Sequence, residues 1–416
     1  MKNSIDKYII ALILGFFIVI SCVEEIDFIQ TNGTFESALV IEATITNELI
    51  QQKIILSRTY AVEEDGPNPE SGATVRIESD QGIINFIEDE PGIYLSENVF
   101  AAQQNVNYKL LVTTSEGKTY TSPHVKLTQE TEIDNLYATR INNDVGINGM
   151  GIFVDSFDPT NNSHYYRYTY EETYKIVAPR WVPKELLVID ESTCEVDLVD
   201  RVEEAEVCYN TVPSTDIILA NTSNLAEDRV FNHQVRFIDS ENFILSYRYS
   251  ILVKQYVQSL EAYTFYKVLK SFSDEGNLFS QIQPGVVVGN MVSETDDLEN
   301  VIGVFDVSTV SEKRLFFNYE DFYPEESIPD FPIVCEPTEH SQYAPNPAFC
   351  GLLISGLVRD RIVYYDGAAK IVDTTFFEDG TFIIDTITIG PFNMMLKPCG
   401  DCREYGTTEQ PIFWED

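Results

Sequence analysis

The stretch LVIEATI, residues 39–45, places an apolar side chain at every second position. Side chains alternate between the two faces of a strand, so this pattern is typical of a β-strand with one buried face. The same alternation recurs at residues 74–78 and 108–112. The sequence therefore predicts several short, half-buried strands in this part of the chain.

Turn-forming residues separate these strands. They are Pro67-Asn68-Pro69, Ser71-Gly72 and Glu116-Gly117, the last of which predicts a hairpin into residues 118–120. Strands and turns at this spacing predict an immunoglobulin-like or transthyretin-like β-sandwich over residues 31–127.

A second, larger β-rich domain is predicted over residues 135–416. We expect strands at 165–170, at 230–237 and 243–258, which would form a hairpin around 239–242, and at 352–358, 361–365, 374–377 and 381–389, with a tight turn at Asp379-Gly380. The predicted fold class is therefore mainly β, a sandwich followed by a larger β domain.

One segment of the second domain has helical spacing instead. Residues 260–270 contain no glycine or proline, and Ser259 is a suitable N-cap. We expect one amphipathic helix that packs an apolar stripe against a sheet, formed by Leu260, Tyr263, Tyr266 and Leu269.

Charge and composition limit the classes of function. The 416 residues carry a net charge of −40, and 44% of them are hydrophobic, with 25 Phe and 23 Tyr. Enough apolar residues are present for real cores. A strongly negative protein repels phosphate backbones, so nucleic-acid binding is not expected.

The N-terminus has the features of an export signal. Lys2 and Lys7 precede an uncharged run that ends at Ile20, which as a helix would span only about 20 Å, less than the ~30 Å core of a bilayer. We therefore predict a signal peptide over residues 1–21, rather than an uncleaved anchor.

The residues around Cys22 indicate a lipid anchor. The order Val19-Ile20-Ser21-Cys22 resembles the lipobox of bacterial lipoproteins, whose cysteine receives the lipid. More than one acyl chain makes anchoring stable. An ordinary secreted form is the alternative. The acidic tether 22–30 resembles the tag that directs some Bacteroidota lipoproteins to the cell surface, although such a run is also a plain solvated linker.

Six further cysteines are disulfide candidates in an exported protein. Local pairing is expected, Cys194 with Cys208, Cys335 with Cys350 and Cys399 with Cys402, although six cysteines allow fifteen pairings. Each of the first two bridges would close a loop of about fifteen residues, worth roughly 3 kcal/mol. The Cys399-Gly400-Asp401-Cys402 motif also fits a redox or zinc site, but no helical pattern or further ligands accompany it.

No familiar catalytic motif appears, and no cofactor is expected. A calcium site at Asp296-Asp297-Leu298-Glu299, or at Glu320-Asp321 with Glu325-Glu326, is a weaker alternative to a solvated acidic surface. We therefore expect a protein that is not an enzyme. A surface hydrolase acting on glycan or peptide stays open as an alternative.

Several motifs, taken in order, resemble an uncharacterised family of Bacteroidota outer-membrane lipoproteins that is catalogued as a domain of unknown function. The residues that carry the resemblance are Asp158, Pro159, Tyr166, Arg167, Gly289, Asn290, Arg403, Gly406 and Trp414. Each also has a structural explanation, in turn chemistry, stacking or docking of the C-terminus.

The resemblance implies a function without implying catalytic residues. Family members are often encoded near TonB-dependent receptors, so we expect a protein anchored by lipid in the outer membrane and facing the cell exterior. It would be an accessory or substrate-capturing subunit of such a receptor or of another outer-membrane complex. An adhesion or envelope scaffold protein is the alternative. Loop tyrosines at 209, 323 and 343 are candidate contacts.

Overall fold

The computed structural model describes residues 37–60, 66–274, 289–296, 299–343, 350–376 and 382–415. The predicted signal peptide, Cys22, the acidic tether and the predicted turn at Asp379-Gly380 lie outside these residues. Within the described ranges, every helix is too short or too polar to cross a bilayer. The fold is mainly β, as predicted.

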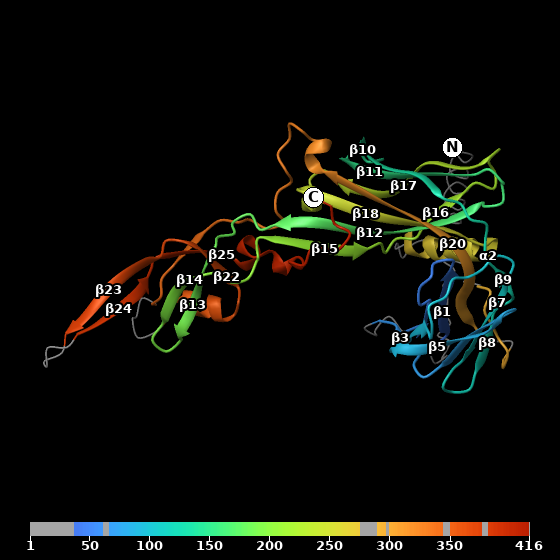
Figure 1. The fold of residues 1–416 in the computed structure, drawn as a ribbon, viewed down its shortest axis with the longest axis horizontal. Coiled ribbons are helices and arrows are strands. Elements are labelled where there is room, and N and C mark those ends of the chain that lie inside the picture. Colours follow the sequence, from blue (N-terminus) through green and yellow to red (C-terminus); the bar gives the residue numbers. More distant parts are fainter. Residues whose placement is uncertain are drawn as a thin grey trace, which may run out of the picture.

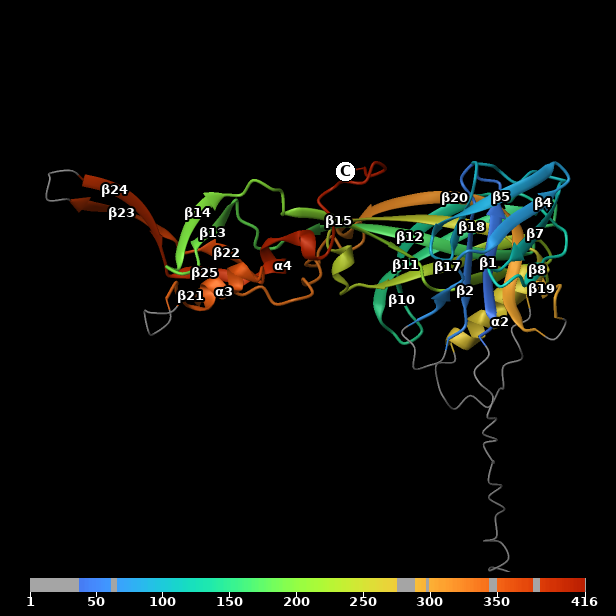
Figure 2. The same cartoon turned by 90° about the horizontal axis from the view of Figure 1, so that it is seen from below.

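The molecule has three parts: a body, an N-terminal module packed against one end of it, and an arm that projects from the other end (Figures 1 and 2). The N-terminal module contains β1 (Leu39–Thr46), β2 (Lys53–Arg58), β3 (Asn68–Pro69), β4 (Thr74–Ser79), β5 (Gly82–Glu90), β6 (Ile93–Ser96), β7 (Asn107–Thr113), β8 (Thr119–Thr121), β9 (Val125–Lys126) and β19 (Val292–Ser293). The strands predicted from residues 39–45, 74–78 and 108–112 are β1, β4 and β7, and β7 forms the predicted hairpin with β8.

The body is a sandwich of two antiparallel sheets. It contains β10 (Ile133–Asn142), β11 (Asn148–Asp158), β12 (Tyr165–Val177), β15 (Val207–Pro213), β16 (Ile218–Asn221), β17 (Asp228–Asp239), β18 (Arg248–Val257) and the second half of β20 (Val301–Asn318), with the 3-10 turns η1 (Phe243–Leu245) and η2 (Tyr319–Asp321). One layer has the order β10-β11-β17, and the other the order β15-β12-β18-β20. Buried residues of both layers, such as Ile152, Tyr168 and Ile251, form its core.

Strand β20 joins the N-terminal module to the body. Its residues 301–308 pair in parallel with β1, and its residues 309–318 pair with β18. Phe305 and Val307 of this strand lie in the core of the N-terminal module. One sheet therefore continues through both parts. The division into two domains at 31–127 and 135–416 stays a prediction.

The arm projects from the body and ends in a two-stranded ribbon (Figure 1). It contains β13 (Lys184–Asp190), β14 (Glu195–Asp200), β21 (Thr338–His340), β22 (Ile362–Asp366), β25 (Phe392–Leu396), α3 (Leu352–Val358) and the ribbon of β23 (Ala369–Phe376) with β24 (Phe382–Ile389). Helix α4 (Lys397–Gly400) and the turn η3 (Cys402–Glu404) lead back to the body. Phe392, Leu353 and Met394 are among the buried residues of its small core.

Two secondary-structure predictions for residues 135–416 were wrong. Residues 352–358 form α3, because Leu353, Ile354 and Leu357 lie on one side of a helix and pack in the core of the arm. Strands β17 and β18 are not a hairpin. The chain crosses between the two layers of the body at η1, so β17 pairs with β11 while β18 pairs with β12 and β20.

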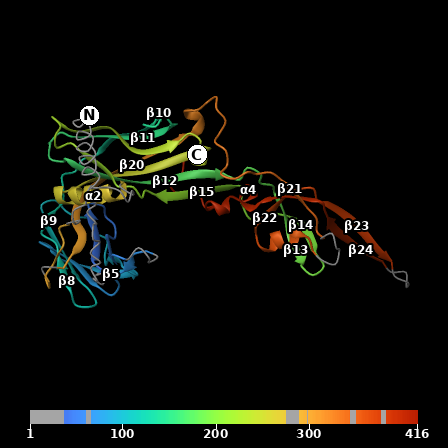
Figure 3. The same cartoon turned by 180° about the vertical axis from the view of Figure 1, so that it is seen from behind.

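Helix α2 (Leu260–Asp274) confirms the predicted helix, and the Ser259 hydroxyl accepts a hydrogen bond from the backbone N–H of Ala262 at 3.2 Å. Tyr263, Tyr266 and Leu269 of the predicted stripe lie on its buried side, but Leu260 does not. Ala262 and Phe265 pack on Val304 of β20, and Leu260 is 53% exposed. The helix covers the place where the N-terminal module meets the body (Figure 3).

The six cysteines form three disulfides, but the predicted local pairing was wrong. The bridges are Cys194–Cys350, Cys208–Cys402 and Cys335–Cys399. Cys194 immediately precedes β14 in the arm, whereas Cys208 lies in β15 of the body, so these two cannot meet.

The bridges close a single ring that runs from the arm to the body. Three chain segments, 194–208, 335–350 and 399–402, are linked end to end by the three disulfides. The ring joins the arm to the body at positions far apart in the sequence. It therefore restricts how the arm can move relative to the body.

Candidate functional site

A cleft of about 540 Å³ opens where β12, β18 and β20 separate near the root of the arm. Its residues come from the end of β12, from the start of β18 and from the segment that follows β20, and they include Lys175, Tyr247, Arg248, Tyr323 and Glu326. Its volume lies in the range of small-ligand pockets, about 300 to 1,000 Å³.

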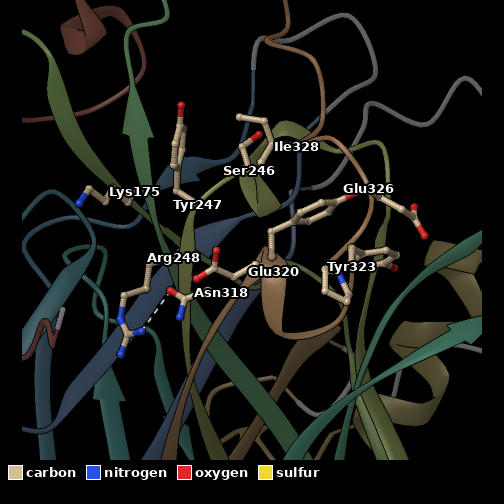
Figure 4. A pocket seen from close by; sticks show the side chains of 11 residues that line it. Lys175, Ser246, Tyr247, Arg248, Asn318, Glu320, Tyr323, Glu326 and Ile328 are labelled. Atoms are coloured by element: carbon tan, nitrogen blue, oxygen red, sulfur yellow. Dashed lines mark hydrogen bonds between the residues drawn. The ribbon is translucent and has the colours of Figure 1, made fainter.

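One wall of the cleft is cationic. Figure 4 shows Lys175, Tyr247 and Arg248 along one side. Arg248 donates from Nη1 to Asn318 Oδ1 at 3.2 Å and from Nε to the carbonyl of Glu415. Among the described residues, neither Lys175 nor Arg248 forms an ion pair within 4.0 Å, although the chain has 67 acids and only 27 bases. This wall therefore presents two cations that form no ion pair in the described residues, and the carboxylate of Glu320 lines the same cleft.

The opposite wall is aromatic. The rings of Tyr319 and Tyr323 stack with centroids 4.6 Å apart, and the Arg140 guanidinium lies 4.4 Å from the Tyr323 ring. Arg140 also pairs with Glu326 at 2.7 Å. Tyr323 is only 1% exposed, and its hydroxyl has no hydrogen-bond partner in the described structure. Buried hydroxyls are normally satisfied, so this unpartnered hydroxyl on a residue that lines the cleft is an exception.

A second, smaller cavity of about 290 Å³ lies on the arm between β13, α3 and β22. Leu187 and Val358 line it and are 43% and 50% exposed. Arg201 also lines it, and burial lowers the pKa of its guanidinium. This arm groove combines exposed apolar side chains with a partly desolvated cation.

Asp158, Pro159 and Tyr166 have structural roles at one end of the body. The Asp158 carboxylate accepts backbone hydrogen bonds from Thr160 at 2.8 Å and from Ser163 at 3.0 Å and so fixes the turn that contains Pro159. Burial acts to raise the pKa of Asp158, but these bonds outweigh it and lower that pKa. The Tyr166 hydroxyl lies 2.8 Å from Asp228 Oδ1 inside the core.

Arg167, Gly289 and Asn290 meet around β20 and α2. The Arg167 guanidinium lies between the rings of Tyr256, at 4.3 Å, and Tyr266, at 4.7 Å. The Asn290 side chain accepts from the N–H of Phe305 at 2.7 Å and donates to its carbonyl at 2.8 Å. A Cβ at Gly289 would lie 1.5 Å from the carbonyl oxygen of Gly303, so only glycine fits there.

Arg403, Gly406 and Trp414 lie at the other end of the body. Arg403 makes a bidentate pair with the buried Asp401, at 2.9 and 2.7 Å. Trp414 packs against Tyr209, with ring centroids 4.9 Å apart, and a Cβ at Gly406 would lie 2.4 Å from the Tyr209 carbonyl. The motif residues thus form three separate groups, none of which lines the cleft beside Lys175.

Two of the three tyrosines predicted as loop contacts are not exposed. Tyr209 and Tyr323 are buried, at 7% and 1% exposed, because the C-terminal segment and the neighbouring aromatic rings cover them. Tyr343 is 50% exposed, and its role as a contact stays a prediction.

Glu299, a candidate calcium ligand, instead accepts hydrogen bonds from Lys118 Nζ at 2.8 Å, Tyr120 Oη at 2.9 Å and Ser293 Oγ at 3.1 Å. In the described residues, no group of three or more His, Cys, Asp or Glu side chains is arranged to hold a metal. Burial acts to raise the pKa of Glu299, but its three partners outweigh burial and lower that pKa.

This network makes acid stability depend on Glu299. A carboxyl whose folded pKa is depressed contributes stability above its unfolded pKa and loses that contribution as pH falls through the folded pKa. Glu299→Gln should therefore lower stability at pH 7, while the gap to the wild type should close as pH falls below the ordinary glutamate range. Urea unfolding at pH 7, 5 and 3 measures this. A gap that is independent of pH would contradict it.

The sequence did not single out Lys175 or Arg248. Each is a base next to tyrosine at the end of a strand, in Tyr174-Lys175 and Tyr247-Arg248-Tyr249, within an acid-rich chain. This local pattern, a base beside a tyrosine, was the signal from which the sequence could have pointed to these two residues. Their placement beside one cleft depends on the pairing of β12 with β18, which the predicted hairpin did not include.

Residues 23–314 match the family described as Domain of unknown function (DUF4249). None of the curated proteins matches significantly. Among solved structures, Escherichia coli alpha-2-macroglobulin activated by porcine elastase is similar over 87% of this chain, at 8% identity and a TM-score of 0.16. The chain spans 28% of that structure's chain, and so weak a likeness carries no inference.

Proposed function

This chain belongs to the DUF4249 family, and we propose that it acts as a non-enzymatic accessory or substrate-capturing subunit of an outer-membrane complex, such as a TonB-dependent receptor. The signal and Cys22 would supply the lipid anchor, and the acidic tether would carry the protein to the cell surface. Anchoring would confine the protein to the plane of the membrane and raise its effective concentration at a partner.

The single observation that carries this proposal is the arm. It projects from the body (Figure 2), and the ring of three disulfides runs from the core of the arm, at Cys194–Cys350, to the core of the body, at Cys208–Cys402. Large apolar side chains are exposed on it, namely Leu187, Ile189, Leu352, Val358 and Leu396. Leu187 and Val358 line the same groove, and exposed apolar side chains that share a groove are typical of a protein-binding surface.

The test is affinity purification of the full-length lipoprotein from its native membrane in mild detergent, with the bound proteins identified by mass spectrometry. Leu187→Asp/Val358→Asp changes the arm groove. Ile83→Asp/Ile87→Asp is the matched control, because both isoleucines are exposed on β5, away from the arm.

We expect the wild type and the β5 variant to retain an outer-membrane receptor in stoichiometric amount, and the arm variant to lose at least tenfold of it. Recovery of the wild type without any such partner would contradict the proposal. Equal retention by the arm variant would contradict the role of the arm.

A further inference from the structure

We propose that the cleft between Lys175, Arg248 and Tyr323 binds short peptides with free termini. This inference rests on the proposed capture role, because it names the class of substrate that the subunit would hold.

The cationic wall suits a carboxylate. Lys175 and Arg248 are half-buried and form no ion pair among the described residues, and Tyr247 also lines the cleft. A ligand carboxylate would form charge-assisted hydrogen bonds with both cations, and such bonds are about twice as strong as neutral ones.

The remaining lining suits the rest of a peptide. Figure 4 shows Glu320 between the two walls, where its carboxylate could accept from the ammonium group of a peptide N-terminus. The unpartnered Tyr323 hydroxyl could donate to a peptide carbonyl. Tyr319, Pro324 and Ile328 offer apolar surface for a side chain. Cations, an acid and an aromatic wall in one cleft are complementary to a zwitterion rather than to a simple anion.

The probe is a synthetic library of tripeptides with free termini, offered to the full lipidated protein in detergent and read by affinity-selection mass spectrometry. A C-terminally amidated copy of the library and an N-acetylated copy test the two ends separately. Oligogalacturonate, an acidic glycan, is offered in parallel. We expect selection of free tripeptides and at least tenfold weaker binding of the amidated copies.

Single substitutions test which residues contact the ligand. The affinity of each variant for the best-bound tripeptide is measured by calorimetry. Lys175→Met should weaken the free acid at least tenfold and leave the amide unchanged, whereas Lys267→Met, an exposed lysine on α2, should change neither. Tyr323→Phe removes a hydroxyl that has no partner, so we expect weaker binding at unchanged folding stability. Glu320→Gln should weaken only peptides with a free N-terminus.

Failure to select any tripeptide, equal binding of acid and amide, or selection of the acidic glycan alone would overturn the inference. The membrane purification, repeated with the same variants, distinguishes failure of this inference from failure of the proposed function. Lys175→Met should still recover the receptor in the membrane purification, because Lys175 is not on the arm. Receptor recovery without peptide binding would contradict only the inference, and peptide binding without a receptor would contradict only the accessory role.

Discussion

Cys208→Ser/Cys402→Ser should lower the free energy of unfolding by about 4 kcal/mol or more. With the other two bridges intact, the shortest path from Cys208 to Cys402 runs through Cys194, Cys350, Cys335 and Cys399, about 32 residues of chain. Closing a loop of that length contributes about 4 kcal/mol in the chain-entropy treatment. Both cysteines are fully buried, so the serine hydroxyls add a cost of desolvation.

Urea unfolding of the oxidised mature chain measures this change. Cys335→Ser/Cys399→Ser is the matched control. It opens the same ring, but Cys335 is only half-buried, so we expect a smaller loss. A loss below about 1 kcal/mol for Cys208→Ser/Cys402→Ser would contradict the role of the ring.

Glu172→Ala should destabilise the body by about 3 to 5 kcal/mol. Glu172 on β12 is buried and accepts hydrogen bonds from Arg236 Nε and Nη2, at 3.1 and 3.0 Å, and from Tyr249 Oη at 2.6 Å. Arg236 lies on β17 in the opposite layer, so the pair joins the two sheets. Removal of the carboxylate leaves the guanidinium and the fully buried Tyr249 hydroxyl without this partner.

The preceding residue on the same strand is the control. Glu171 is 45% exposed, and its Oε1 lies 4.0 Å from Arg314 Nη2. Glu171→Ala should therefore cost less than about 1 kcal/mol, since exposed ion pairs contribute little. Thermal and urea unfolding of both variants provide the comparison. Equal losses for the two would show that the buried network does not hold the layers together.

Alternation in the sequence was sufficient to predict the strands of the N-terminal module, because one face of β1, β4 and β7 is buried throughout. It could not predict that β20, from far along the chain, completes that module beside β1. Pairing between distant strands depends on tertiary packing, which local periodicity does not record. Residues 352–358 were assigned to a strand because a short apolar run fits either structure.

The cysteines show the same limit. Spacing correctly identified the segments 194–208, 335–350 and 399–402, which became the three chain links of the ring. The assignment of bridges within those segments failed, because the fold separates the two ends of each segment. The cleft was missed for a related reason, since Lys175 and Arg248 come together only through the pairing of β12 with β18.

The central claim is that the arm binds an outer-membrane partner. Site-specific photo-crosslinking in living cells is its most direct test. A photoreactive amino acid is placed at Leu187 in the arm groove and, for comparison, at Ile83 on β5, which is exposed in the N-terminal module. The account predicts a specific crosslink from position 187 to an outer-membrane receptor or assembly protein and none from position 83. Crosslinks only from position 83, or none from position 187, would contradict it.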